Sequence, residues 1–208
     1  MHELPVPSTV DPADPSYVEN PVTTERFHFH SPPDDPESDP LAFDCWTAPG
    51  MRALPSHVHP RQDESFTVAD GTLELVVDGD ATRHDAGETV TVPRGTPHTW
   101  RTGGDDALHV TIRIEPALQT EGFLRDLAAL GRRGALDDAG TPSSLQVAAL
   151  YDAYGYDLLH LASPPLAVQK LAFGALAPLA RRLGYRANPV ARARDDDEGL
   201  AGLENESV

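Results

Sequence analysis

Two short runs between residues 50 and 102 constrain this chain more than any other feature of its sequence. The first run, HVHPRQDESFTVADG, covers residues 57–71, and the second, GETVTVPRGTPH, covers residues 87–98. Together they supply three imidazoles and one carboxylate, which is a plausible ligand set for a single metal ion. The four candidate ligands are His57, His59, Glu64 and His98.

The spacing within these runs places the four side chains on compatible faces. Side chains alternate along a β-strand, so His57 and His59 are expected to point to the same side. Glu64 begins the following strand and shares a face with Phe66. A carboxylate in an apolar interior is costly unless it is paired or bound to a metal. His98 comes from a separate strand, and the sequence therefore predicts one ion held between strands.

The region from about residue 22 to residue 116 reads as short strands separated by turns. In the segment LHVTIRI, residues 108–114, alternation separates four large aliphatic side chains from His109, Thr111 and Arg113. Further strands are predicted at residues 22–30, 41–49, 51–59, 64–68, 72–79, 88–92 and 98–102. Many short strands with regular turns favour an antiparallel barrel or sandwich.

The two runs resemble the two sequence motifs of the cupin superfamily. Residues 50–71 match the first motif, with six rather than five residues between Gly50 and His57. Residues 87–98 match the second motif, Gly-x5-Pro-x-Gly-x2-His, in full. Thr102 stands where the family usually has asparagine, but that position is not a ligand, so the predicted metal site is unaffected.

The resemblance implies an all-β core, an antiparallel jelly-roll barrel spanning residues 21–116. It also implies that one divalent metal ion is held inside this barrel by the four candidate ligands. Three imidazoles and a carboxylate suit Fe, Mn, Ni, Cu or Zn as the divalent ion, and the sequence does not choose between them. The ligand set implied by the family is His57, His59, Glu64 and His98.

The pattern after the barrel changes to helical spacing. Helices are predicted at residues 118–130, 144–154 and 166–183, within an extension that covers residues 117–190. These helices could cover the barrel or form a subunit interface, and together with the family resemblance they favour a homodimer. The Pro- and Asp-rich residues 1–20 and the acidic residues 191–208 are expected to be disordered.

The composition indicates which partners, source organism and cellular location to expect. Sixteen basic against thirty-three acidic residues give a net charge of −17, which disfavours nucleic acid and anionic membranes as partners. Lys170 is the only lysine, and this acidic, lysine-poor balance favours a salt-loving source organism. One cysteine, no cationic and apolar leader and no long apolar run make the cytoplasm the expected location.

Four further residues are candidates for a substrate pocket. Gln62 could be a hydrogen-bond partner of a metal ligand or simply a turn residue. Phe66 and Trp100 could line the pocket or belong to the core. His109 could point into the pocket as an acid or base, although its neighbours on the same face favour the barrel exterior equally well. The sequence assigns no catalytic residue.

The remaining histidines and the cysteine have simpler interpretations. His28 and His30 form another His-x-His pair, but no suitably spaced carboxylate follows them in a strand, so metal binding is not expected there. His84 and His160 are interpreted as surface or packing residues, and Cys45 as a small buried hydrophobe.

Three functional hypotheses follow from the predicted site. The first is a metal-dependent enzyme similar to quercetinase-type cupin dioxygenases, acting on a small organic substrate. The second is a metal-dependent isomerase or lyase, which would turn over without oxygen. The third is a non-catalytic cupin that binds or senses a small molecule and is stabilised by it without chemical change.

Overall fold

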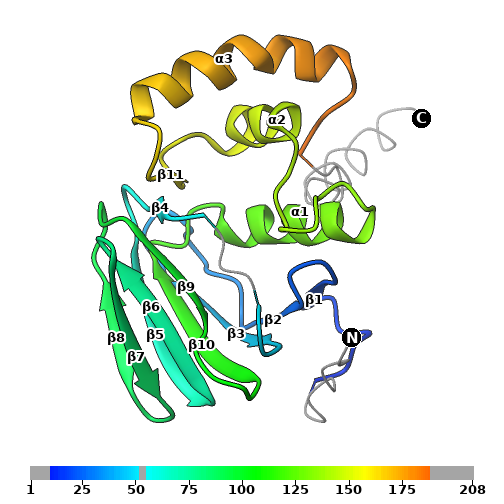
Figure 1. Cartoon of the computed structure of the whole chain (residues 1–208). Coiled ribbons are helices and arrows are strands. Elements are labelled where there is room, and N and C mark those ends of the chain that lie inside the picture. Colours follow the sequence, from blue (N-terminus) through cyan, green and yellow to red (C-terminus); the bar gives the residue numbers. More distant parts are fainter. Residues whose placement is uncertain (1–9, 52–54, 188–208) are drawn as a thin grey trace, which may run out of the picture.

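The computed structural model describes residues 10–51 and 55–187 and contains two β-sheets and three helices. The sheets face each other and form a barrel, and the three helices are stacked over one end of it (Figure 1). The predicted disordered tail at residues 191–208 lies outside the described residues, as do residues 1–9 of the predicted N-terminal disordered segment. The N-terminal prediction differs from the structure at its end, because Tyr17–Asn20 forms a strand.

The larger sheet has six strands, all paired antiparallel, in the order β1-β2-β3-β10-β5-β8. Its strands are β1 (Tyr17–Asn20), β2 (Glu25–Phe29), β3 (Leu41–Thr47), β5 (Asp63–Asp70), β8 (Thr89–Val92) and β10 (Leu108–Glu115). The second sheet has five strands in the order β11-β4-β9-β6-β7. Its strands are β4 (His57–Val58), β6 (Thr72–Val77), β7 (Asp80–Asp85), β9 (His98–Thr102) and β11 (His160–Leu161).

The core lies between the two sheets because apolar side chains alternate with polar ones along the strands. In β10, Leu108, Val110, Ile112 and Ile114 are all buried, as the alternation predicts. Phe66 of the larger sheet meets Trp100 of the smaller one in an edge-to-face contact with ring centroids 6.0 Å apart. The predicted antiparallel jelly-roll with an apolar interior is confirmed.

Three strands were not predicted from the sequence. β7 is almost entirely exposed and polar, so it has no apolar alternation to detect. β1 and β11 are only four and two residues long, and β1 pairs with the next strand, β2, whereas β11 pairs with the distant strand β4. The strand expected at residues 51–59 is limited to β4, while residues 52–54 lie outside the described part of the chain.

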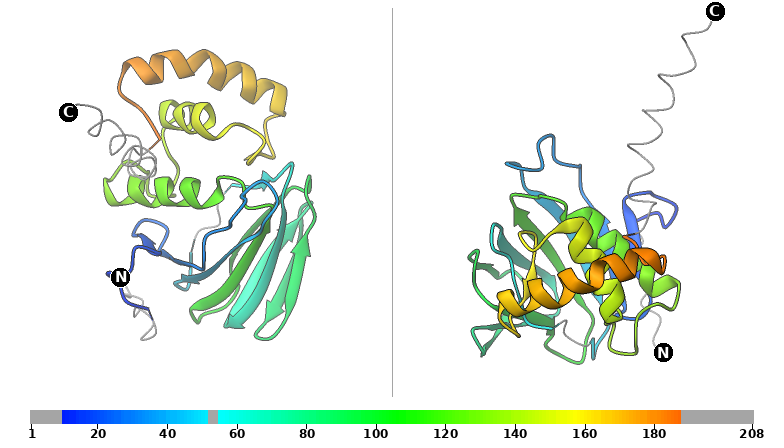
Figure 2. Two further views of the ribbon diagram at one scale, coloured as in Figure 1. Left: turned by 180° about the vertical axis from the view of Figure 1, so that it is seen from behind. Right: turned by 90° about the horizontal axis from the view of Figure 1, so that it is seen from above.

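The predicted helices are confirmed as α1 (Thr120–Arg132), α2 (Ser144–Tyr154) and α3 (Leu166–Arg182). The Ser143 hydroxyl caps α2 by accepting from the Gln146 amide, and α3 follows Pro165. Between α2 and α3 the chain returns to the barrel as β11, which pairs with β4. Figure 2 shows from above how the helices cross this end of the barrel. The extension is therefore built into the smaller sheet as well as packed over it.

Candidate metal centre

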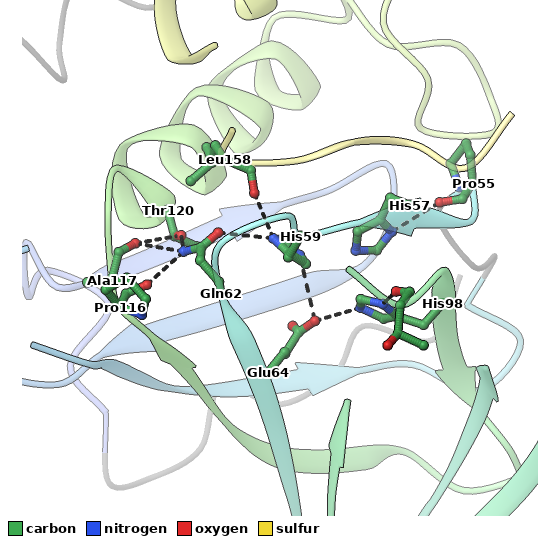
Figure 3. Close-up of polar contacts among 11 residues, drawn as sticks. Pro55, His57, His59, Gln62, Glu64, His98, Pro116, Ala117, Thr120 and Leu158 are labelled. Carbon is green, nitrogen blue, oxygen red and sulfur yellow. Dashed lines mark hydrogen bonds and ion pairs between the residues drawn. The ribbon is translucent and has the colours of Figure 1, made fainter. Parts of the chain in front are cut away.

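Four side chains from three strands and one loop meet at the helix-covered end of the barrel (Figure 3). His57 of β4 and His98 of β9 are direct partners in the antiparallel register. His59 follows β4, and Glu64 reaches across from β5 in the opposite sheet. Each of the four offers one ligand atom, and these atoms all lie within 4.8 Å of one another. The structure thus brings together all four predicted ligands.

Each imidazole in the cluster is oriented by a backbone carbonyl. The Nδ1 atoms of His57, His59 and His98 lie 3.1, 2.9 and 2.9 Å from the carbonyl oxygens of Pro55, Leu158 and Thr96. A carbonyl oxygen can only accept, so each Nδ1 must carry the proton. In the neutral ring this leaves the lone pair on Nε2, and such an arrangement is typical of metal-binding histidines.

Glu64 is the acidic member of the cluster and is buried. Its Oε2 atom lies 2.8 Å from Nε2 of His98 and 3.7 Å from Nε2 of His59. Burial acts to raise the pKa of this carboxyl, but the hydrogen bond from His98 and the nearby imidazoles lower it overall. The same contact requires a proton on His98 Nε2, which a bound cation would replace.

The donor set and its geometry fit one divalent metal ion. Ligand distances of about 2.1 Å place ligand atoms within about 4.2 Å of one another, so binding needs only a small contraction of the cluster. Burial and the other two histidines lower the pKa of His57 to about 3, which favours the neutral imidazole that a metal requires. The four residues could therefore hold a metal ion, whose identity the ligands leave open among Fe, Mn, Ni, Cu and Zn.

Gln62 connects the cluster to the start of the helical extension. Its side-chain oxygen accepts from His59 Nδ1 at 3.1 Å. Its amide nitrogen lies 2.9, 3.0 and 2.8 Å from the Pro116 carbonyl, the Ala117 carbonyl and the Thr120 hydroxyl. This buried side chain is the hydrogen-bond partner of a candidate ligand, which was one of its two interpretations.

An apolar cavity of about 160 Å³ adjoins the cluster, and His57 forms part of its wall. The other walls come from α1, α2 and residues 155–161, and they include Phe123, Leu127, Leu150, Tyr151 and Leu158. None of these wall residues was predicted, since the sequence does not reveal how a helical extension docks on a barrel.

The other predicted pocket residues lie elsewhere. Phe66 and Trp100 are buried in the barrel core. Of the two orientations that the sequence left open for His109, the structure shows the outward one. Its neighbours Leu108 and Val110 face the core, so His109 points to the outer face, where its ring stacks on Trp46.

The stretch that carries all four candidate ligands matches a known protein family. The family model described as "Cupin domain" matches residues 46–113. Quercetin 2,3-dioxygenase of Bacillus subtilis is 43% identical over 49 residues, which are 24% of this chain. The match spans only 14% of the length of that dioxygenase.

Solved structures with similar folds include an RmlC-like cupin from Shewanella frigidimarina, with a TM-score of 0.44 and 17% identity over 52% of this chain and 90% of that one. KdgF from Halomonas sp. has a TM-score of 0.39 and 21% identity over 44% of this chain and 80% of its own. With both cupin motifs in register on a two-sheet barrel, residues 46–113 of this chain form a cupin domain.

Proposed function

We propose that this protein is a metal-dependent enzyme of the dioxygenase type that acts on a small, mainly apolar organic substrate. One observation supports this most: the buried cluster of three oriented imidazoles and a carboxylate has His57 in the wall of an apolar cavity. A substrate in that cavity would lie directly beside the candidate metal ligands. The similarity to a short segment of quercetin 2,3-dioxygenase is consistent with this proposal.

The residues of the chain have distinct parts in this proposal. His59, Glu64 and His98 are buried and hold the ion from the barrel side, while the partly exposed His57 holds it from the cavity side. A redox-active ion bound there would supply the chemistry of oxygen or substrate activation, whereas zinc would supply Lewis-acid chemistry. The apolar walls exclude water from the reacting groups.

The cavity limits the size and polarity of the substrate. An apolar protein cavity of about 150 Å³ is known to hold benzene, so about 160 Å³ suits a substrate portion of one ring. The hydroxyls of two wall tyrosines already have partners, Tyr151 with Gln169 and Tyr154 with Asp126. A sugar would meet few hydrogen-bonding groups in this cavity, which argues against a sugar isomerase.

A non-catalytic binding protein is the second candidate function. Among the residues that line the cavity, only His57 and two tyrosines can titrate, so the cavity itself offers little acid or base chemistry. A pocket of this kind could bind an apolar ligand beside the metal without changing it. The isomerase or lyase hypothesis is disfavoured for the same reason.

The test uses the full chain purified without a histidine tag at high salt. Metal analysis comes first, followed by oxygen uptake with a panel of one-ring phenols and diketones, measured for wild type and His57→Ala/His98→Ala. The exposed-strand variant His84→Ala serves as the matched control. Oxygen consumption that needs both metal and substrate, and is lost only in the double variant, would support the dioxygenase proposal.

Other outcomes separate the alternatives. Turnover without oxygen would favour an isomerase or lyase. Ligand-induced thermal stabilisation with no turnover of any substrate would favour the binding protein. Wild-type protein that takes up no metal after reconstitution would contradict the ligand assignment.

We also propose that the protein is a cytoplasmic homodimer with a small-molecule ligand, without nucleic-acid or membrane partners, in a salt-loving organism. In the described part of the chain, no helix has the length and apolarity needed to span a membrane. The helix α3 exposes Val168, Leu171 and Leu179, and Leu183 directly after it is also exposed; a subunit interface would cover these side chains. Light scattering of wild type and Leu171→Glu would test the dimer.

A further inference from the structure

A second group of histidines surrounds a carboxylate on the outer face of the larger sheet. His28 lies on β2, His30 follows the end of that strand, and Asp44 lies directly opposite His28 on β3. Each of the three offers one ligand atom, and these atoms lie within 4.8 Å of one another. The carboxylate that the sequence could not place beside His28 and His30 thus comes from the neighbouring strand.

Strand alternation fixes these side chains on the outside of the barrel. Phe27 and Phe29 are buried in the core, so His28 and His30 must point outward. The two imidazoles, at the end of β2 and just beyond it, have ring centroids 6.2 Å apart. A pair of imidazoles two residues apart in a strand needs little rearrangement to bind one ion.

Asp44 is held in place by residues of the adjoining strand β10. Its Oδ1 atom accepts from the Thr111 hydroxyl at 2.7 Å and lies 3.2 Å from Nε2 of His109. Its Oδ2 atom lies 3.1 Å from Nε2 of His30. Because Oδ1 is occupied by β10, Oδ2 is the oxygen directed toward His28 and His30.

We propose that His28, His30 and Asp44 form a second, surface site for a divalent transition-metal ion, with His109 as a positioning residue for Asp44. Two imidazoles and a carboxylate are ligands that Zn, Cu(II) and Ni(II) accept. The bound ion replaces the proton shared between His30 and Asp44. The site is independent of the interior cluster, because its ligands point away from the barrel on the opposite face of the sheet.

The experiment counts Zn²⁺ equivalents by equilibrium dialysis on the full chain without a tag. Wild type is expected to bind two equivalents, and both His57→Ala/His98→Ala and His28→Ala/His30→Ala are expected to bind one. The variant that combines all four substitutions is expected to bind none. If the interior cluster binds no metal, His57→Ala/His98→Ala matches wild type at one equivalent, and only the surface variant loses it.

Two further variants test the proposed roles of Asp44 and His109. Asp44→Asn preserves the shape of the side chain and is expected to weaken surface binding at least about tenfold, and His109→Ala about 10-fold to 100-fold. His84→Ala, on the exposed strand β7, should leave both equivalents in place. The proposal is overturned if His28→Ala/His30→Ala and Asp44→Asn bind Zn²⁺ as wild type does, or if the fourfold variant retains an equivalent.

Discussion

Two clusters of histidines around a carboxylate lie on opposite sides of the larger sheet, one inside the barrel and one outside it, and they differ in burial and in what orients their histidines. In the interior cluster the side chains of His98 and Glu64 are 1% and 7% exposed. In the outer cluster those of His30 and Asp44 are 41% and 21% exposed. Inside, backbone carbonyls fix the imidazoles, whereas outside Asp44 itself holds His30 and His109.

Two sites with similar ligands therefore need not have the same affinity for a metal ion. The interior imidazoles are held in position before any ion arrives, so binding there orders little. The outer His30 side chain is 41% exposed to water, and it is held by Asp44, which is itself a proposed ligand. We therefore expect the interior site to bind Zn²⁺ more tightly than the outer one.

The largest effect is expected from removing interior ligands. His57→Ala/His98→Ala should weaken interior metal binding at least about 100-fold and abolish metal-dependent activity, because two of four ligands are lost. Competition with a chromophoric chelator measures the affinity. Equal affinity of the two sites in wild type, in the same titration, would contradict the proposed role of the backbone carbonyls.

Glu25 is a buried carboxylate that lies outside both histidine clusters, so it tests the effect of burial on a carboxylate apart from them. Burial raises its pKa from 4.5 to about 7, although a hydrogen bond from Thr23 acts in the opposite direction. The folded state therefore binds its proton more tightly, and stability falls as the pH rises from about 4.5 to about 7.

At pH 8, Glu25→Gln should raise the free energy of unfolding by up to about 3 kcal/mol, and at pH 4 it should change little. Urea denaturation at the two pH values measures this difference. The variant Glu37→Gln, whose exposed carboxylate pairs with Arg61, is the control and should not raise the free energy of unfolding at pH 8. An unchanged stability of Glu25→Gln at pH 8 would show that Glu25 ionises normally in the folded protein.

Substitution of Gln62 tests whether the residue that accepts a hydrogen bond from His59 affects metal affinity inside the barrel. Gln62→Ala should weaken interior metal binding about 10-fold to 100-fold, because His59 loses one of its two Nδ1 acceptors. Gln169→Ala is the matched control, since Gln169 is also buried and bonds to the Leu161 and Pro164 carbonyls. Both variants should unfold more easily, but only Gln62→Ala should alter metal affinity.

The smallest effect is expected from filling the cavity beside His57. Val147 lines the cavity and is only partly buried, so Val147→Phe should narrow it without disturbing the barrel core. Binding of phenol as a probe should weaken about tenfold, while metal affinity stays unchanged. Leu171→Phe on the exposed face of α3 is the control. Unchanged phenol binding would mean that the ligand lies elsewhere.

The sequence predicted the interior cluster because its members are fixed by local spacing and recognisable turns. It could not predict the outer cluster, because the pairing of Asp44 with His28 joins strands through a long loop. It also left the direction of His109 open, since alternation gives two faces but does not say which one borders a cavity. The apolar cavity depends on how α1 and α2 dock, and no local pattern encodes that.

The hydrogen bond from His59 to the Leu158 carbonyl joins residues ninety-nine positions apart, so a metal ion bound by His59 would be energetically linked to helix docking. By reciprocity, an ion that fixes His59 favours the docked extension by the same free energy with which docking favours the ion. Limited proteolysis would then report metal occupancy, since a chelator would expose the chain between α2 and α3 to cleavage. The docking of the helical extension would thus depend on whether the metal centre that it covers is occupied.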